Sequence, residues 1–279
     1  MESLGQYRKI RLGIVLLFLA LMATEFLSGC MPSRLKKLKT WHQNGLYEQV
    51  VQSKIDCIDA SPECFEIKLI RADSYYRLEK YDQAYVYVKD ALERASAKVD
   101  PSDLVSAYTL YSELLFEKAK KTDQFVQKRH FVNQLLTNVE QALQVNAAFT
   151  STPQGKETQK TLVQLKAEAL LMKMDLVEPD SLDSFYQQLC QTADELETYF
   201  PDQGYRKYYC LRGEFKQLLP ELKRAIITGE TLAPEVKSRL MEIQNQARAL
   251  QQMPLYRHGY AGAIDLFLDN LERFLSQLE

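Results

Sequence analysis

Residues 64–97 read CFEIKLIRADSYYRLEKYDQAYVYVKDALERASA, and this stretch carries the pattern of two packed helices. Its apolar residues recur at spacings of three and four, which is typical of amphipathic helices. Ala72 in the first segment, and Ala84 and Ala91 in the second, are small residues that let two helices approach each other closely. Tyr75 and Tyr81 supply rings that fill the grooves between neighbouring helix pairs. The stretch therefore predicts a helical hairpin.

The chain matches itself at an offset of 34 residues, a period typical of repeat architectures. The aligned pairs are Trp41 with Tyr75, Tyr47 with Tyr81, Val50 with Ala84, Cys57 with Ala91, and Ile58 with Leu92. Residues 64–97 resemble one tetratricopeptide repeat, and Pro62 stands where that family closes the preceding unit with proline. Residues 31–64 match half of the pattern, since Arg34 and Lys37 occupy places usually taken by Trp and Leu. The resemblance implies an antiparallel helix-hairpin solenoid, and the alternative is a generic helical bundle with a chance periodicity.

The rest of the chain also predicts an all-α fold. Gly (10 residues) and Pro (9 residues) are sparse, and good helix formers dominate. No segment shows the sustained alternation of apolar and polar residues that is typical of a β-strand. Helical stripes run through 104–115, 236–250 and 264–278, and we expect breaks at prolines. These prolines are Pro101, Pro153, Pro179, Pro201, Pro220 and Pro254.

The predicted domains are helical repeats over residues 30–150 and degenerate repeats over 151–279. The register slips beyond Ala97, with longer connections expected around 120–124 and 145–156. A continuation is expected because a lone hairpin cannot bury its faces and such solenoids need about three units. Residues 259–279 are predicted to form the closing amphipathic helix.

The first 29 residues resemble a bacterial lipoprotein signal peptide. Three basic residues precede about a dozen mostly apolar residues at 12–23, too few for a membrane span of roughly 20 residues. Leu27-Ser28-Gly29-Cys30 then resembles the lipobox, which implies cleavage before Cys30 and lipidation of that residue. Glu25 is unusual in such a stretch. The alternative is an ordinary signal peptide followed by an incidental cysteine.

The residue after Cys30 bears on location. In lipoproteins of Gram-negative bacteria, Asp at that place is the usual signal for retention in the inner membrane, and this chain has Met31 instead. The resemblance therefore implies the periplasmic face of the outer membrane, or the outer face of the single membrane if the host has one. Residues 30–279 carry 32 basic and 35 acidic residues, a balance that argues against a nucleic-acid partner.

Four further cysteines form two symmetric pairs. Cys190 and Cys210 lie ten residues either side of Phe200, in a stretch that predicts a turn between two antiparallel helices. Cys57 and Cys64 flank the Ala60-Ser61-Pro62-Glu63 turn in the same way. We expect both pairs to form disulfides in an oxidising compartment. The alternative is that each cysteine is a buried small apolar residue.

Catalytic patterns are absent from the sequence. His42, His130 and His258 have no companion ligands at metal-binding spacing, so neither a metal nor another cofactor is expected. No phosphate-binding, dinucleotide-binding or serine-hydrolase motif occurs. The interpretation is a protein without enzymatic activity.

The predicted working surface comes from the tetratricopeptide resemblance. The first helix of each unit lines the concave groove of that family, and its groove positions correspond here to Glu66, Leu69, Asp73, Tyr76 and Arg77. Tyr and Arg are residue types that contribute most to interface energy. The sequence thus predicts a lipid-anchored scaffold that binds another envelope protein. A small-ligand-binding lipoprotein of a periplasmic uptake system is the alternative, and an envelope hydrolase is a third class that the sequence does not favour.

Overall fold

The computed structural model describes residues 34–55, 57 and 59–277 of the chain. The predicted signal peptide at 1–29 and the predicted lipidation of Cys30 lie outside these residues. The described part is all-α, with eleven α-helices and no strand. Across the same residues, none of the helices combines the length and the apolar character needed to cross a bilayer.

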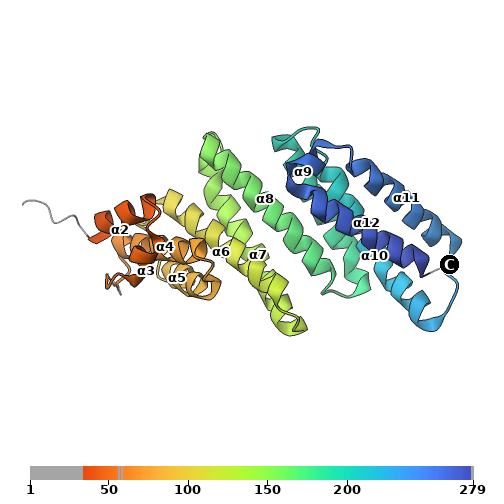
Figure 1. Ribbon diagram of the computed structural model, residues 1–279, viewed down its shortest axis with the longest axis horizontal. Helices are drawn as coiled ribbons and strands as arrows, with labels where there is room; N and C mark the ends of the chain where they lie inside the picture. Colours follow the sequence, from red (N-terminus) through yellow and green to blue (C-terminus); the bar gives the residue numbers. More distant parts are fainter. Residues whose placement is uncertain (1–33, 56, 58, 278–279) are drawn as a thin grey trace, which may run out of the picture.

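The helices follow one another with short connections (Figure 1). Their bounds are α2 (Arg34–Gln43), α3 (Tyr47–Gln52), α4 (Pro62–Arg77), α5 (Tyr81–Glu93), α6 (Pro101–Lys121), α7 (Phe125–Asn146), α8 (Pro153–Met174), α9 (Leu182–Tyr199), α10 (Tyr205–Thr228), α11 (Pro234–Leu250) and α12 (Ala261–Ser276). Three short helical turns, η1 (Ala147–Phe149), η2 (Pro179–Ser181) and η3 (Tyr256–Tyr260), lie in the connections.

The helices form an elongated row, with α2 at one end and α11 and α12 at the other (Figure 1). From α2 to α12, each helix contacts the next along the chain. The even-numbered helices make an additional set of contacts, because α2 meets α4, α4 meets α6, α6 meets α8, α8 meets α10, and α10 meets α12. The even-numbered helices are therefore neighbours of one another along the whole row.

Several helices begin at the predicted prolines. Pro62, Pro101 and Pro153 each occupy a first helical position, where the missing N–H costs no hydrogen bond. The preceding side chain caps the helix in all three cases, as when the Ser61 hydroxyl accepts a hydrogen bond from the Cys64 backbone N–H at 3.1 Å.

The prediction of a break at Pro220 is wrong, since Pro220 lies inside α10. Proline leaves the carbonyl of residue 216 without its usual helical partner, which normally kinks or ends a helix. Here the residues that follow are held by the core, with Leu222 fully buried and Ala225 almost so. Tertiary packing therefore carries α10 past the proline to Thr228.

The connection expected around 120–124 is short, since only three residues separate α6 from α7. The 34-residue period is lost beyond Ala97 because the helices there are longer. Helices α6 and α7 contain 21 and 22 residues, whereas α4 and α5 contain 16 and 13.

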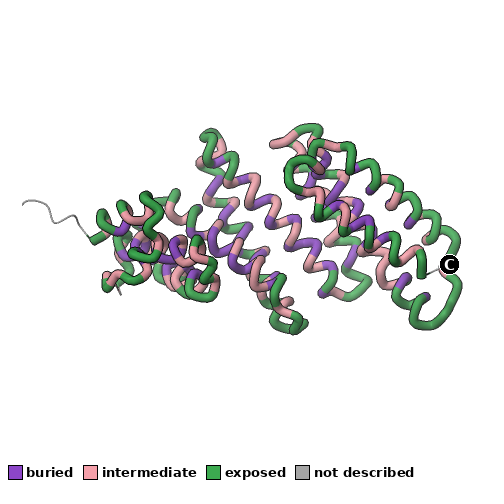
Figure 2. The backbone as a smooth tube through the Cα atoms, in the orientation of Figure 1, coloured by how far each residue is buried: buried purple, intermediate pink, exposed green. Residues whose placement is uncertain are grey.

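Two large apolar clusters fill the row, and α8 contributes to both. Leu162, Leu165 and Ala169 pack in the cluster shared with α4 to α7. Val163 and Leu170 pack in the cluster shared with α9 to α12. Figure 2 accordingly shows buried residues distributed along the length of the row rather than gathered at one centre. The core thus continues across the boundary predicted at 150/151.

The hairpin predicted from residues 64–97 is α4 packed on α5. Its small residues Ala72, Ala84 and Ala91 are all buried. The Tyr75 ring stacks on the Tyr87 ring with centroids 5.4 Å apart, so these aromatics fill the space beside the small residues.

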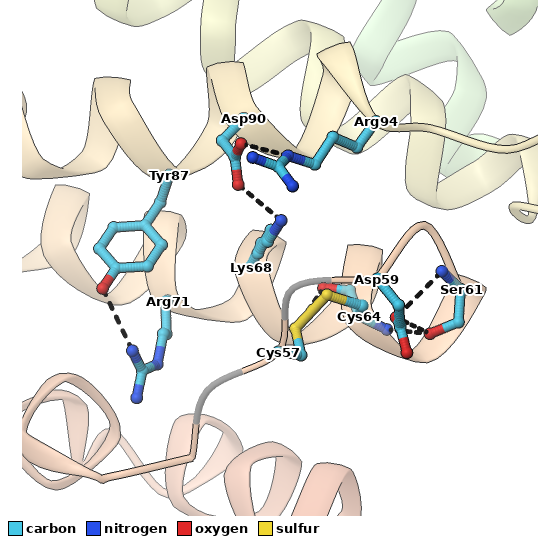
Figure 3. The surroundings of a disulfide bond; sticks show 9 residues. All are labelled: Cys57, Asp59, Ser61, Cys64, Lys68, Arg71, Tyr87, Asp90 and Arg94. Atoms are coloured by element: carbon cyan, nitrogen blue, oxygen red, sulfur yellow. Dashed lines mark hydrogen bonds and ion pairs between the residues drawn. A yellow bond between two sulfur atoms is a disulfide. The ribbon is translucent and has the colours of Figure 1, made fainter.

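Both predicted cysteine pairs lie at disulfide distance. The Cα atoms are 5.5 Å apart in the Cys57–Cys64 pair and 5.2 Å apart in the Cys190–Cys210 pair. The first pair joins the segment after α3 to the start of α4 (Figure 3). Beside it, the Lys68 ammonium pairs with Asp90 of α5 at 2.5 Å, and Arg71 donates both to Tyr87 of α5 and to Ser53 after α3.

Candidate functional site

The candidate site is the polar face made by α2, α4 and α6. We call it the α2/α4/α6 face and define it by three residues of α4, Asp73, Tyr76 and Arg77, with His42 of α2 and Glu113 of α6. These side chains come together because the even-numbered helices are neighbours.

Asp73 connects α4 to α2. Its carboxylate lies 2.6 Å from the Nε2 atom of His42 and 3.5 Å from the Nε atom of Arg77. Burial acts to raise the pKa of Asp73, but the hydrogen bond from His42 and the positive charges beside it lower the pKa below its usual value. Asp73 is therefore held as a carboxylate, and the Arg77 side chain stays 57% exposed above it.

Tyr76 connects α4 to α5 and α6. Its ring packs edge-on against Tyr81 with centroids 5.5 Å apart, and its hydroxyl is hydrogen-bonded to Glu113. Burial and the nearby Glu113 charge raise the pKa of Tyr76 well above its ordinary value. Burial also raises the pKa of Glu113. Tyr76 is thus half-buried and internally bonded, so that Arg77 is the more accessible of the two predicted anchors.

Glu66 lies on the same face, closer to the N-terminal end of α4. It forms an ion pair with Lys39 of α2. Burial and the charge of Glu66 raise the pKa of Asp103 in α6, which places these two carboxylates close together. Glu66 therefore also bridges neighbouring even-numbered helices.

Leu69, the fifth predicted site residue, is half-buried and packs against the apolar cluster of α4 to α8. Its contacts are those of a core residue at the edge of the face. We therefore interpret Leu69 as a packing residue that holds α4 in place.

The α2/α4/α6 face carries more acidic than basic groups. Together with the charged residues beside it, its carboxylates are Glu66, Asp73, Asp103, Glu113 and Glu117, and its basic groups are Lys39, His42, Arg77 and Lys120, the ion-pair partner of Glu117. Such an excess attracts a partner of opposite charge and raises the rate of encounter.

A second polar cluster lies between α8, α10 and η3. The Arg212 guanidinium donates to Glu168 at 3.1 Å and to the Tyr208 hydroxyl at 2.7 Å. The Gln164 amide donates to the Tyr260 hydroxyl at 3.0 Å. Burial raises the pKa of Tyr260 to about 12, so its hydroxyl stays protonated and able to donate. Sequence reasoning missed this cluster entirely.

Two depressions bear on the small-ligand alternative. One, of about 130 Å³, lies between α10 and α12 and combines Arg212 and Lys216 with Phe215 and Phe267. Its volume is below the roughly 300 to 1,000 Å³ of small-molecule sites. Both cations already have carboxylate partners, Glu168 and Asp175.

The second depression, of about 570 Å³, lies between the start of α5 and the α6–α7 hairpin. Charged side chains of both signs line it, among them Asp82, Glu117, Lys118 and Lys121. Tyr81 and Phe131 also line it, but the many charges differ from the one or two convergent charges that a small-ligand site would favour.

Within the described ranges, no three His, Cys, Asp or Glu side chains gather as a metal site. Comparison of the chain with family models, with curated proteins and with solved structures finds no match. The function is therefore inferred from the surfaces of this chain itself.

Proposed function

We propose that this chain is a lipid-anchored helical-repeat scaffold that binds a protein partner on the α2/α4/α6 face. In this proposal the helix pairs form a tetratricopeptide-like solenoid, and the even-numbered helices line its concave side. The mutual contacts of the even-numbered helices are the observation that carries the proposal, because a solenoid needs one set of helices to form a continuous inner surface.

The partner segment should be basic. The α2/α4/α6 face and the charged residues beside it offer five carboxylates against four basic groups, and exposed Arg77 provides the kind of side chain that anchors interfaces. No covalent chemistry is needed for such a role, and we propose a scaffold without enzymatic activity.

A crosslinking experiment tests the binding face. A photoreactive residue is placed at 77 on the face, or at 86 on α5 as a control, in the full chain in its own envelope. Val86 is 62% exposed and lies on an odd-numbered helix. We expect an adduct with a discrete protein from position 77 and none from 86. Equal adducts from both positions, or none from 77, would contradict the assignment.

A matched pair of substitutions measures the contribution of the face. Arg77→Ala should weaken capture of that protein about 30-fold, the effect of losing roughly 2 kcal/mol at an interface anchor. Arg248→Ala on α11 is the control, because Arg248 is 52% exposed and pairs with Glu272 much as Arg77 pairs with Asp73. Equal loss in both variants would indicate a general charge effect.

The proposed location is the periplasmic face of the outer membrane, supported by the lipobox at 27–30 and by Met31. Mass spectrometry of protein extracted from membranes should show loss of residues 1–29 and added acyl mass on Cys30. An unmodified Cys30 in an uncleaved chain would overturn the anchor. Fractionation of the two membranes checks the location separately.

The small-ligand alternative would place its ligand in the depression beside Arg212 and Lys216, although that depression is small and both cations have carboxylate partners. An anionic apolar ligand bound there would protect α10 and α12 from hydrogen exchange and leave α4 unchanged. A protein partner on the α2/α4/α6 face would give the opposite pattern.

A further inference from the structure

The end of the α6–α7 hairpin exposes large apolar side chains to solvent. Phe125 and Val126, the first two residues of α7, are 54% and 78% exposed. Exposed apolar residues scattered singly are ordinary, but adjacent ones at a projecting tip mark an interaction site. We call residues 121–129 the α6–α7 tip.

Basic residues flank this apolar pair in the sequence, and the Lys121 ammonium lies 4.4 Å from the centre of the Tyr81 ring of α5. Lys121, Lys128 and Arg129 form no ion pair with the described residues, whereas Lys118 and Lys120 pair with Asp82 and Glu117. Asp123 is the single carboxylate between 121 and 129. The tip is therefore basic on a chain whose net charge is −2.

A second tip also combines adjacent exposed apolar residues with basic ones. Ile226 and Ile227, close to the end of α10, are 38% and 83% exposed, and the basic residues Lys223 and Arg224 precede them. We call residues 223–229 the α10–α11 tip. Arg224 lies 4.0 Å from Glu230, and no ion pair of Lys223 occurs within the described part of the chain.

The two tips lie on the same edge of the molecule. Helices α6 and α10 both end at the lower edge in Figure 1. The α8–α9 connection between them lies higher in that view and does not reach as far down. That connection carries Glu178 and Asp180, while Asp123 lies within the first tip and Glu230 directly follows the second. Two projecting tips on one edge match a flat surface better than a pocket on a single partner.

We propose that this edge rests on an anionic lipid surface. Phe125 and Val126 enter the boundary between headgroups and acyl chains, while Lys121, Lys128 and Arg129 contact lipid phosphates. Ile226 and Ile227 provide the second, weaker contact. An apolar side chain gains free energy on leaving water at this boundary, and each adjacent Lys or Arg adds electrostatic attraction to anionic lipid.

This inference goes beyond the proposed function. A lipid on Cys30 would hold one end of the chain at a membrane, but it would leave the row of helices free to rotate. The two tips fix which edge faces the lipid.

Depth-dependent quenching in the full chain tests the proposal. In a Trp41→Phe background, which removes the only tryptophan, Phe125→Trp reports on the tip and Val86→Trp serves as the control. Vesicles contain brominated phosphatidylcholine either alone or with phosphatidylglycerol. We expect the lipid bromines to quench the tryptophan at 125 about twofold or more in anionic vesicles, with little quenching at 86.

Charge variants test the role of the cations. Lys121→Glu, Lys128→Glu and Arg129→Glu together should abolish quenching at 125. The control triple, Lys98→Glu, Lys156→Glu and Arg257→Glu, makes the same charge change on exposed residues away from the two tips and should leave quenching in place.

Three results of the quenching experiment would overturn the lipid contact. They are absence of quenching at 125, equal quenching at 86 and 125, and equal quenching at 125 with and without anionic lipid. Protection of position 125 by an acidic protein in place of lipid would also overturn it. Quenching at 125 is independent of crosslinking at 77, so failure of the lipid contact and failure of the proposed binding face are distinguishable.

Discussion

The Nε2 atom of His42 in α2 lies 2.6 Å from the Oδ2 atom of Asp73 in α4. This contact joins two helices that are separated in sequence by α3. The same carboxylate oxygen lies 3.5 Å from Arg77, so one acidic group accepts contacts from its own helix and from the preceding even-numbered helix. The stability of the α2/α4/α6 face should therefore depend on the charge of Asp73.

The pKa of Asp73 predicts how this stability varies with pH. Its folded-state pKa is lower than the usual 3.8, so the ionised form is favoured by folding. The stabilisation is therefore present above pH 3.8 and is lost as pH falls through the folded-state pKa. Asp73→Asn should be less stable than the parent by about 1 kcal/mol at pH 7, with the difference gone at low pH. Urea unfolding across pH measures this. Exposed Asp269→Asn is the control, and a pH-independent difference for Asp73→Asn would contradict the prediction.

Ala84 is fully buried between α4 and α5. Ala84→Glu places a longer, charged side chain in a filled site, at a cost of about 3 kcal/mol or more. Val86→Glu on the same helix is the control because Val86 is 62% exposed. Thermal unfolding followed by circular dichroism should show a large fall in Tm for the first variant and little change for the second. Equal Tm values for the two variants would contradict the burial of Ala84 in the α4–α5 hairpin.

Removing one partner of the partly buried Glu168–Arg212 pair should lower the free energy of unfolding more than removing one partner of an exposed pair. Both side chains are about one quarter exposed, at 24% and 25%. Glu168→Ala leaves Arg212 without its carboxylate and should cost about 2 kcal/mol. Asp194→Ala removes the partner of Arg206, where both side chains are more than half exposed, and should cost less than about 1 kcal/mol. Chemical denaturation compares the two, and similar costs would count against the difference.

The Cys190–Cys210 disulfide closes a loop between α9 and α10. A sequence separation of 20 residues predicts that Cys190→Ser with Cys210→Ser lowers the free energy of unfolding by about 3 kcal/mol. Denaturation of the oxidised parent and of the double variant measures the loss. Peptide mapping without reductant should recover 190 linked to 210 and 57 linked to 64. Free thiols at these positions in mature protein would refute the pairings.

The helical class and the α4–α5 hairpin could be predicted because they depend on local pattern. Small residues at 72, 84 and 91, with apolar residues at spacings of three and four, indicate a packed helix pair whatever the rest of the chain does. The choice of Asp73 and Arg77 came from the tetratricopeptide resemblance of the same stretch, and their role in binding stays a prediction. Pro220 shows the limit of local rules, since core packing keeps α10 helical where the residue alone predicts a break.

The partners of Asp73 and Tyr76 were beyond the sequence pattern. Glu113 belongs to α6, whose length breaks the 34-residue period, so no repeat position pointed to it. The sequence gives His42 no partner at ligand spacing, and its pairing with Asp73 depends on how α2 crosses α4. The Gln164–Tyr260 bond joins residues 96 apart, and no local rule relates such positions.

The row of helices has a mechanical consequence. The two ends, α2 and α12, lie far apart, and the helices between them are held mainly by their immediate neighbours (Figure 1). A pull applied across the two ends therefore passes through every helix interface in series. Small displacements at each interface add up, so the molecule extends and bends like a spring while each helix pair keeps its own core.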